Sequence, residues 1–600
     1  MLVQLLGYLL AALPRRVVAG CCYLAGTLLR LSPRGGLVHR NRQMALGLKP
    51  QDKTLALKAC ERTVELGLLG IAGQFFSQRR WQRTIYISPD TKAKIQELLK
   101  DPKGILLLIP HTTLMEALTA LPALTGLPRR TSVLYRAFKS PVLEKIILGR
   151  REKHGVRLLN RSTGVRTLIR EIQAGQIGAI LFDQSSGEKG SLISFMGRVA
   201  AVSDLPDIIA KHTDLNAFIF AIKRTSFWRG ELVVEKLDNS KRAPSLALQA
   251  HQWLENYLKN PVTSTDWLWT HRRWKVLDRP REVLGFAGRE VLQKSWSEKK
   301  TRIFVRLPNW LGDVVMALPM LRALRASRPD VHITYLSRSA YIPLLNKFPL
   351  ADRFIGLPAD GLPSWILCSR LSHEHPDASI ALTNSIRGDI EMLVTGAKIR
   401  IGLRREGYAR PLLTDGYAIL RRNLETTHQS KVLEEMFKHF GLTTEVSYAP
   451  FTMNPFNRNG PIGFVPGSSN TPEKRYPAEL WRDLAIKLNR PIALFGSPTE
   501  QEIGQTISHN LPLVTDFIGK TALDGLADEL SKCSLIIGND TGAIHLANAL
   551  GIPTIVLYGP TSPLRTRPVF HVGVTQIKAP EGQGIETIKV DEIFERVMRG

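Results

Sequence analysis

A short polar segment in the last part of the chain has the residue types of a phosphate site. Asp540, Thr541, Gly542 and His545 lie between two apolar runs within residues 535–563. Thr541 can cap a helix that begins one or two residues later, and such a helix start offers free N–H groups and a positive dipole end to a diphosphate. Gly542 leaves the backbone open to an anion, and His545 can donate a hydrogen bond to it. An ordinary capped helix with a core histidine explains the same spacing, and spacing alone slightly favours this simpler interpretation.

The pair His111 and Glu116 is a second candidate for chemistry. His111 follows the apolar run 104–110, which predicts a buried strand, and precedes a helical pattern of leucines. With His111 on the loop and Glu116 in the first helical turn, the carboxylate can hold one ring nitrogen while the other accepts a proton. The segment from Thr113 to Glu116 also fits a helix capping box, which requires no catalysis. The residues alone leave the two interpretations equal.

Alternating strands and helices in the second half of the chain predict how its candidate residues are positioned. Strands are expected at residues 302–307, 332–336, 462–465, 492–495, 535–537 and 554–558. Their order implies right-handed parallel crossovers and two doubly wound α/β domains, residues 301–455 and 456–600. Ligands of such sheets bind outside the carboxyl ends of the strands, so we expect Asp313 and Asp540 to face one cleft. Asp313 is either a base or a helix N-terminal acid that stabilises the dipole.

Two apolar runs, residues 1–13 and 17–29, begin the chain. A membrane-spanning helix needs about 20 apolar residues, so two shorter runs suit an interfacial or re-entrant anchor better. Arg15 and Arg16, between the runs, are then expected among cytoplasmic lipid headgroups. A cleaved signal is disfavoured because these arginines interrupt the apolar region and no basic region precedes it. A buried hairpin of soluble helices remains the alternative.

The composition of the chain indicates which class of partner it binds. The 600 residues require several domains, and the formal net charge of +28 implies an acidic partner. No zinc-ligand spacing, RNA-binding aromatic motif or basic tail is present, so anionic lipid is favoured over nucleic acid. The five cysteines form no disulfide or metal pattern and suit a reducing compartment. No paired carboxylates with metal spacing accompany the diphosphate segment, and we predict neither a metal nor a cofactor.

The second half of the chain resembles glycosyltransferase family 9, the ADP-heptose:lipopolysaccharide heptosyltransferases, and type II more than type I. Two segments carry the resemblance: residues 306–315, RLPNWLGDVV, and residues 540–553, DTGAIHLANALGIP. It implies a GT-B fold of two Rossmann-like domains, an ADP-heptose donor and an inner-core acceptor. It further implies that Asp313 is the base for the acceptor hydroxyl and that Lys474 steadies the departing phosphates. The donor would also be bound by Asp540, Thr541, Gly542 and His545.

Residues 1–275 resemble the lipid A acyltransferases, whose motif of a histidine, four residues and an acid is filled by His111 and Glu116. Further matching segments are Tyr135-Arg136, Arg151 with Gly155, Asp183-Gln184, Phe195 to Gly197, and Trp267 to Lys275. Pro110 and Ala137 depart from the family pattern, which affects substrate detail. The resemblance implies acyl transfer from acyl carrier protein to a hydroxyl of a lipid A precursor, with His111 as base and Glu116 orienting it. Candidate substrate-binding residues are Arg136, Arg151, Asp183 and Gln184. The aromatic and basic run 267–275 is expected at the membrane interface, with a packed edge of the core as the alternative.

The two resemblances together predict a fusion. A membrane-associated segment, 1–31, would precede a glycerolipid-acyltransferase-like α/β domain, 32–275, a linker, 276–300, and the GT-B half. We expect a bifunctional lipopolysaccharide enzyme on the cytoplasmic face of the inner membrane. Its expected partners are acyl carrier protein, the lipid A precursor, the lipopolysaccharide core and anionic lipid, and nucleic acid is not among them. Two alternatives stay open: one half is only a binding module, or the second half uses another nucleotide sugar.

Overall fold

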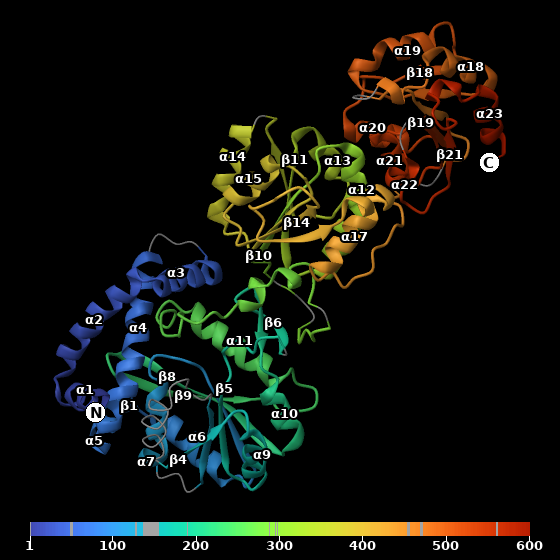
Figure 1. Cartoon of the computed structure of the whole chain (residues 1–600). Coiled ribbons are helices and arrows are strands. Elements are labelled where there is room, and N and C mark those ends of the chain that lie inside the picture. The colour runs from blue at the N-terminus through green and yellow to red at the C-terminus, as the bar shows by residue number, and fades with distance from the viewer. Residues whose placement is uncertain are drawn as a thin grey trace. The chain divides into compact units, whose positions relative to one another are not determined.

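The computed structural model describes residues 2–599 apart from 48–51, 126–128, 136–154, 189, 287, 294–295, 297, 360, 453–456, 469–471 and 560–561. The chain forms two compact units (Figure 1). The first comprises Met1–Leu277 and Gly288–Lys300, and the second comprises Asp278–Ala287 and Thr301–Gly600.

The segment expected to be a linker, 276–300, is divided between the units. Its residues Asp278–Ala287 belong to the second unit, where Leu284 N donates to Phe440 O at 3.0 Å. Its later part belongs to the first unit, where Arg289 Nε donates to Gly190 O at 3.0 Å. The Leu284 side chain is buried in the second unit, and the Arg289 side chain is hydrogen-bonded in the first unit. Both parts of the segment are therefore held in place.

The first unit is built on a seven-stranded sheet of order β1-β9-β8-β2-β5-β3-β4, in which only β8 and β9 pair antiparallel. Its strands are β1 Ile85–Tyr86, β2 Gly104–Ile109, β3 Thr131–Tyr135, β4 Val156–Asn160, β5 Ile177–Leu181, β8 Leu215–Ser226 and β9 Arg229–Leu237. A separate hairpin consists of β6 Ser191–Phe195 and β7 Arg198–Val202. The central strands are apolar on both sides because apolar cores cover both faces of the sheet.

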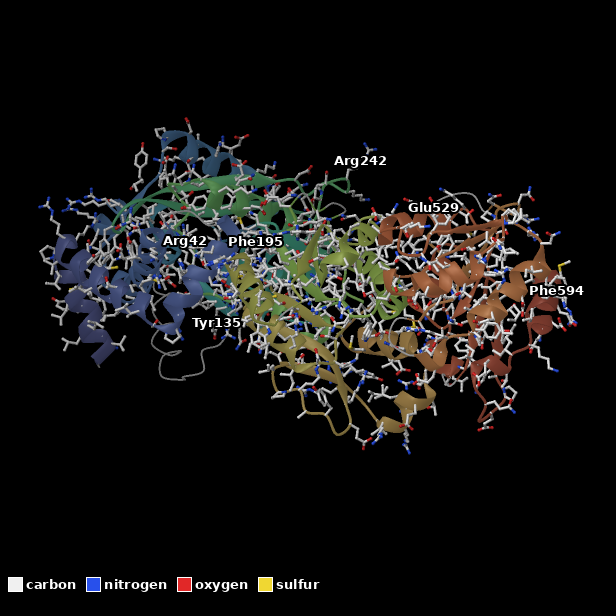
Figure 2. All side chains as sticks on the ribbon, turned by 90° about the horizontal axis from the view of Figure 1, so that it is seen from above. Arg42, Tyr135, Phe195, Arg242, Glu529 and Phe594 are labelled. Atoms are coloured by element: carbon white, nitrogen blue, oxygen red, sulfur yellow. The ribbon has the colours of Figure 1, made fainter. Side chains whose placement is uncertain are left out.

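Helices cover this sheet. They are α1 Leu2–Ala12, α2 Arg15–Leu31, α3 Pro33–Leu46, α4 Asp52–Ala72, α5 Gln78–Gln82, α6 Pro89–Lys100, α7 Leu121–Thr125, α9 Val165–Gln173, α10 Leu205–His212 and α11 Leu246–Lys259. Within the interior lie the side chains of Arg42 and Phe195, whereas Arg242 projects from a loop (Figure 2). Both α1 and α2 pack against α4. Within the described residues, no helix combines the length and the apolar character needed to span a bilayer.

The second unit contains two six-stranded parallel sheets with the same topology, β12-β11-β10-β13-β14-β15 and β18-β17-β16-β19-β20-β21. The first sheet has β10 Thr301–Arg306, β11 Val331–Arg338, β12 Arg353–Leu357, β13 Ala378–Ala381, β14 Ile399–Arg405 and β15 Asp415–Ile419. The second has β16 Ile462–Val465, β17 Ile492–Leu494, β18 Val514–Asp516, β19 Leu535–Asn539, β20 Thr554–Tyr558 and β21 Val574–Lys578. This is the predicted pair of doubly wound domains, and in each the strand order reverses beside the first strand.

Helices accompany both sheets of the second unit, and the two that carry candidate residues, α12 and α21, follow strands β10 and β19. The helices are α12 Leu311–Ser327, α13 Ile342–Leu345, α14 Gly361–Arg370, α15 Ile386–Val394, α16 Arg421–Thr426, α17 Gln429–His439, α18 Ala478–Leu488, α19 Gln501–Ser508, α20 Leu523–Leu530, α21 Gly542–Ala549, α22 Pro563–Thr566 and α23 Val590–Arg599. Helices α12 and α21 contact each other at their starts. A Cβ atom on Gly542 would lie 2.8 Å from Leu311 Cβ, so this close approach requires glycine.

Candidate active sites

In the first unit, His111 and Asp183 meet at the carboxyl ends of two neighbouring strands. Ile109 of β2 and Leu181 of β5 are register partners, so the residues that follow them leave the sheet at the same edge. His111 Nδ1 lies 2.6 Å from Asp183 Oδ1, and the His111 backbone N donates to Asp183 Oδ2 at 2.8 Å. Trp267 Nε1 donates to the same Oδ2 at 2.6 Å. Asp183 therefore fixes the orientation of the imidazole ring.

The hydrogen bonds to Asp183 keep this buried carboxylate ionised. Burial opposes the charged form, but the attraction of His111 and the hydrogen bonds from His111 and Trp267 outweigh it and hold the pKa of Asp183 below its ordinary value. An ionised Asp183 accepts the Nδ1 proton of His111, which leaves Nε2 as the basic atom. Gln184 Nε2 lies 2.9 Å from His111 Nε2. A substrate hydroxyl that reached His111 Nε2 would therefore take the place of the Gln184 amide.

The expected pairing of His111 with Glu116 is not the one the structure has. Asp183 and Gln184 are the side chains at the two ring nitrogens. The reason lies in the local fold, because the segment after His111 makes a β-bridge from Thr112 to Trp267 before a 3₁₀ helix, Met115–Ala120, begins. The capping-box interpretation is wrong as well, because Leu114 is the N-cap residue of that helix and gives no side-chain cap.

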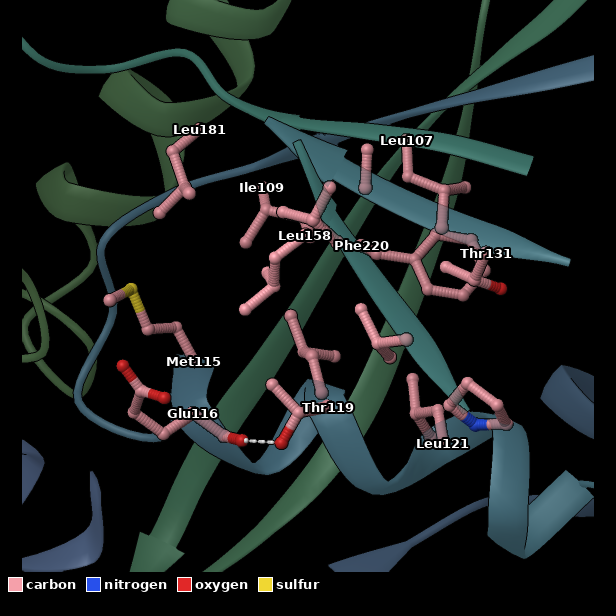
Figure 3. A pocket seen from close by; sticks show the side chains of 15 residues that line it. Leu107, Ile109, Met115, Glu116, Thr119, Leu121, Thr131, Leu158, Leu181 and Phe220 are labelled. Atoms are coloured by element: carbon pink, nitrogen blue, oxygen red, sulfur yellow. Dashed lines mark hydrogen bonds between the residues drawn. The ribbon is translucent and has the colours of Figure 1, made fainter. Parts of the chain in front are cut away.

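Glu116 instead lines a narrow cavity of about 90 Å³ between this helix and the sheet (Figure 3). Met115 and Glu116 lie on one side of it and Thr131 on the opposite side. The other lining residues are almost all apolar and come mainly from alternating positions of β2 to β5: Leu107, Ile109, Leu118, Thr119, Leu121, Pro122, Val133, Val156, Leu158, Ala179, Leu181 and Phe220. Because Ile109 and Leu181 stand two residues before the His111 and Asp183 pair, an apolar chain in this cavity would end beside the base.

Two further predictions for the first unit have different outcomes. Arg136 and Arg151 lie outside the described residues, and their phosphate-binding role stays a prediction. The run 267–275 is mostly interior, contrary to the expected membrane interface. Trp267, Trp269, Arg273 and Trp274 are buried, and Arg273 Nη1 donates to Ala201 O at 2.7 Å. The aromatic rings of this run therefore pack in the core, which was the alternative interpretation, and Trp267 also donates to Asp183.

In the second unit, Lys474 and His545 of the predicted phosphate site lie close to Asp540. Lys474 Nζ lies 3.1 Å from Asp540 Oδ2, and His545 Nε2 lies 3.8 Å from Asp540 Oδ1. Burial opposes ionisation of Asp540, but His545 and Lys474 hold its pKa below the ordinary value. Thr541 is the N-cap residue of α21, but its side chain makes no capping bond, and its buried Oγ1 has no partner within the described chain. The hydroxyl and the first turn of α21 are thus available to a ligand.

Asp313 faces the same cleft, as predicted. A cavity of about 1000 Å³ is lined by Asp313 and Gly312 at the start of α12 and by Lys474, Asp540 and His545. Burial raises the pKa of Asp313, although a hydrogen bond with Gln429 and the charges of His545 and Arg405 oppose the shift. A carboxylate with a raised pKa is a stronger base than an ordinary aspartate.

The cleft also contains residues that were not predicted. They include Trp310, Arg338, Tyr341, Ser468, Ser497, Glu500 and Thr566. The guanidinium carbon of Arg338 lies 5.4 Å from the centroid of the Trp310 ring, whose side chain is exposed. Most of these residues lie at or just after strand ends, so the rule that led to Asp313 and Asp540 could also have identified Arg338 and Ser497.

Family models match both parts of the chain. Residues 365–591 match the family model for glycosyltransferase family 9 (heptosyltransferase), and residues 1–276 match that for bacterial lipid A biosynthesis acyltransferase. Lipooligosaccharide heptosyltransferase 2 of Haemophilus influenzae is 27% identical over 48% of this chain and 90% of its own length. Lipopolysaccharide heptosyltransferase 1 of Escherichia coli O18:K1:H7 is 33% identical over 44% of this chain and 87% of its own.

A solved structure resembles the same part. The E. coli ADP-heptose lipopolysaccharide heptosyltransferase II is 25% identical and matches 50% of this chain and 98% of its own, with a TM-score of 0.45. The matched family model and the relative that is 33% identical agree on the family of the second half. Through its second half the chain belongs to glycosyltransferase family 9, the heptosyltransferases, and its first 276 residues match the lipid A acyltransferase family.

Proposed function

We propose that the chain carries two activities of lipopolysaccharide assembly. The second unit transfers heptose from ADP-heptose to the lipopolysaccharide inner core, and the first transfers a fatty acyl group from acyl carrier protein to a hydroxyl of a lipid A precursor. The observation that carries the proposal is the position of His111 and Asp313. Each lies at the carboxyl ends of parallel strands, His111 near the mostly apolar cavity and Asp313 in the cleft that also contains Lys474 and His545.

In the second unit, Asp313 acts on the acceptor. It takes the proton of the acceptor hydroxyl while that oxygen bonds to the anomeric carbon, and ADP leaves with the electron pair of the broken C–O bond. Lys474 and the first turn of α21 supply positive charge to the departing diphosphate, and His545 donates a hydrogen bond to it. In this proposal the donor needs no cofactor.

In the first unit, His111 Nε2 takes the proton of the precursor hydroxyl. The hydroxyl oxygen attacks the thioester carbonyl, the C–S bond breaks, and the thiol leaves with the proton from the imidazolium. Asp183 stabilises that imidazolium through Nδ1. The cavity beside the pair receives the fatty chain, which its mostly apolar lining favours.

The N-terminal helices provide the membrane contact in this proposal. Large apolar side chains on and beside α1 and α2 are exposed: Leu5, Leu6, Tyr8, Leu9, Leu13, Val17, Tyr23, Leu24, Leu28 and Leu31. A patch of this kind on two surface helices, in a chain of net charge +28, suits attachment to anionic lipid at the cytoplasmic face of the inner membrane.

The test uses the full chain, because residues 276–300 are shared between the units. Wild type is supplied with an acyl carrier protein thioester or with ADP-heptose, and the lipid product is weighed by mass spectrometry. Two mass increments, one per donor, are expected. Loss of only the acyl increment in His111→Ala and only the sugar increment in Asp313→Asn would assign each activity to its unit. A wild-type chain that adds one increment would reduce the other unit to a binding module.

A further inference from the structure

A smaller cavity of the second unit has three arginines and two glutamates in its wall. It encloses about 420 Å³ and is bounded by Asn384, by residues 405–408 at and after the end of β14, by α16 and by Arg565 of α22. Both carboxylates already have partners on α16, because Glu406 accepts from Arg421 N at 3.0 Å and Glu425 forms an ion pair with Arg421. Helices α16 and α22 contact each other, so the wall joins the domains of both sheets. The loops after β13 and β14 lie at the ligand-binding edge of the first sheet.

Arg405 and Arg565 differ from the buried arginines of this unit. Neither has an ion pair or a side-chain hydrogen bond among the residues the structure describes, and the two repel each other. Partial burial, then the charges of Arg565 and Arg410, lower the pKa of Arg405. Buried arginines nearby instead each meet a carboxylate: Arg306 meets Glu391, Arg328 meets Asp330 and Arg410 meets Asp389. Two unpaired guanidinium groups facing one cavity call for an anion that is not part of the chain.

The two arginines connect this cavity to both halves of the proposed reaction. Arg405 acts on Asp313, whose pKa it lowers against the effect of burial. Arg565 precedes Thr566, which donates to Asp540 Oδ2 at 3.4 Å on the donor side of the cleft. An anion held here would therefore act on the proposed base through the charge of Arg405.

We propose that this cavity binds an anionic substituent of the sugar acceptor, a phosphate or a carboxylate, and that the bound anion bridges Arg405 and Arg565 and so joins the two domains of the second unit. The inference rests on the proposed heptosyl transfer. The anion replaces repulsion between the two arginines with two charge-assisted contacts, so acceptor binding draws the domains together around the donor. It also neutralises Arg405, which makes Asp313 a stronger base once the acceptor is in place.

The first test needs no turnover. Inorganic phosphate is titrated into the full chain saturated with ADP, and its effect on the melting temperature is compared among wild type, Arg405→Ala, Arg565→Ala and Arg422→Ala. Arg422 is the matched control, because it is an exposed arginine of α16 that does not line the cavity. Stabilisation lost in the first two variants and kept in the control is expected. The same response in all four proteins would overturn the anion site.

The second test measures the acceptor KM for heptosyl transfer. With a charged acceptor, Arg405→Ala should raise KM about 10- to 100-fold, which corresponds to the loss of one charged hydrogen bond, and Arg422→Ala should leave it unchanged. Two altered acceptors identify the bound group: one is treated with phosphatase and the other has its carboxylates amidated. The treatment that removes the bound group should raise the KM of wild type to that of Arg405→Ala.

The outcomes separate the two proposals. A wild type that transfers heptose with the same KM as Arg405→Ala would overturn the anion site and leave the transfer standing. A wild type that binds phosphate through Arg405 but transfers no heptose would refute the proposed function alone.

Discussion

The aspartates of the two candidate sites follow parallel strands in the same way, yet the protein shifts their pKa values in opposite directions. Asp183 receives hydrogen bonds from the His111 backbone, the His111 ring and Trp267, and its pKa is lowered. Asp313 is partly buried with Gln429 as its hydrogen-bond donor, and its pKa is raised. The opposite shifts fit the roles that we propose, in which the carboxylate with more donors orients His111 and the one with fewer donors acts as the base.

The largest expected effect is that of His111→Ala on acyl transfer. Removal of a general base costs roughly 100- to 10,000-fold, and heptosyl transfer should not change because Asp313 serves that reaction. Rates with each donor, measured on one preparation, check both statements. Near wild-type acylation would remove His111 from the mechanism.

Asp313→Asn should cost heptosyl transfer a similar factor while ADP affinity, followed by calorimetry, barely moves. The substitution should also raise the melting temperature at pH 7. A raised pKa means that the folded chain binds this proton more tightly than the unfolded chain, so ionisation costs stability as pH rises through the folded pKa. The gain in melting temperature should therefore fade below the ordinary aspartate pKa of 3.8. A variant that kept full transfer would leave Asp313 only a dipole-stabilising role.

Asp183→Asn tests the other aspartate against Glu116→Gln. An amide at position 183 cannot stabilise the imidazolium, so acyl transfer should fall roughly 100-fold or more. Glu116→Gln should cost less, because Asp183 and Gln184 hold the two nitrogens of the His111 ring. Single-turnover rates of the two variants decide the order, and a larger loss in Glu116→Gln would reverse the assignment.

Lys474→Ala should weaken ADP binding about 10-fold, because its ammonium meets the diphosphate in ground and transition states alike. The loss of the lysine also leaves the negative charge of Asp540 less compensated in the cleft. Calorimetry with ADP gives the change, and Lys487→Ala, an exposed lysine of α18, is the control. Equal ADP affinity in all three proteins would argue that Lys474 is a surface lysine.

The smallest effect concerns the membrane. The double variant Leu24→Gln and Leu28→Gln removes two exposed apolar side chains of α2 and should reduce binding to anionic vesicles several-fold, whereas Leu513→Gln, an exposed leucine of the second unit, should not. Vesicle sedimentation at low and high salt separates apolar from electrostatic binding. Undiminished sedimentation of the double variant would place the contact elsewhere.

The sequence predicted the strands of both sites because their apolar runs are continuous, as in β16 and β20, which have the predicted bounds. It could not predict that Asp183 meets His111. Strands β2 and β5 are neighbours in the sheet but are separated along the chain by β3 and β4, so only the topology brings their ends together. Glu116 lies in the first turn of the helix after His111, as expected, but the β-bridge between Thr112 and Trp267 comes between them along the chain, and Asp183 occupies Nδ1 of His111.

The shared segment 276–300 has a consequence for proteolysis. The chain passes from one unit to the other after Leu277, after Ala287 and again after Lys300. A protease that cuts once near residue 288 leaves residues 278–287 covalently joined to the first unit yet bound within the second, where Arg328 Nη1 donates to Val283 O at 2.5 Å. The nicked chain would run as two bands on a denaturing gel but elute as one species from a sizing column.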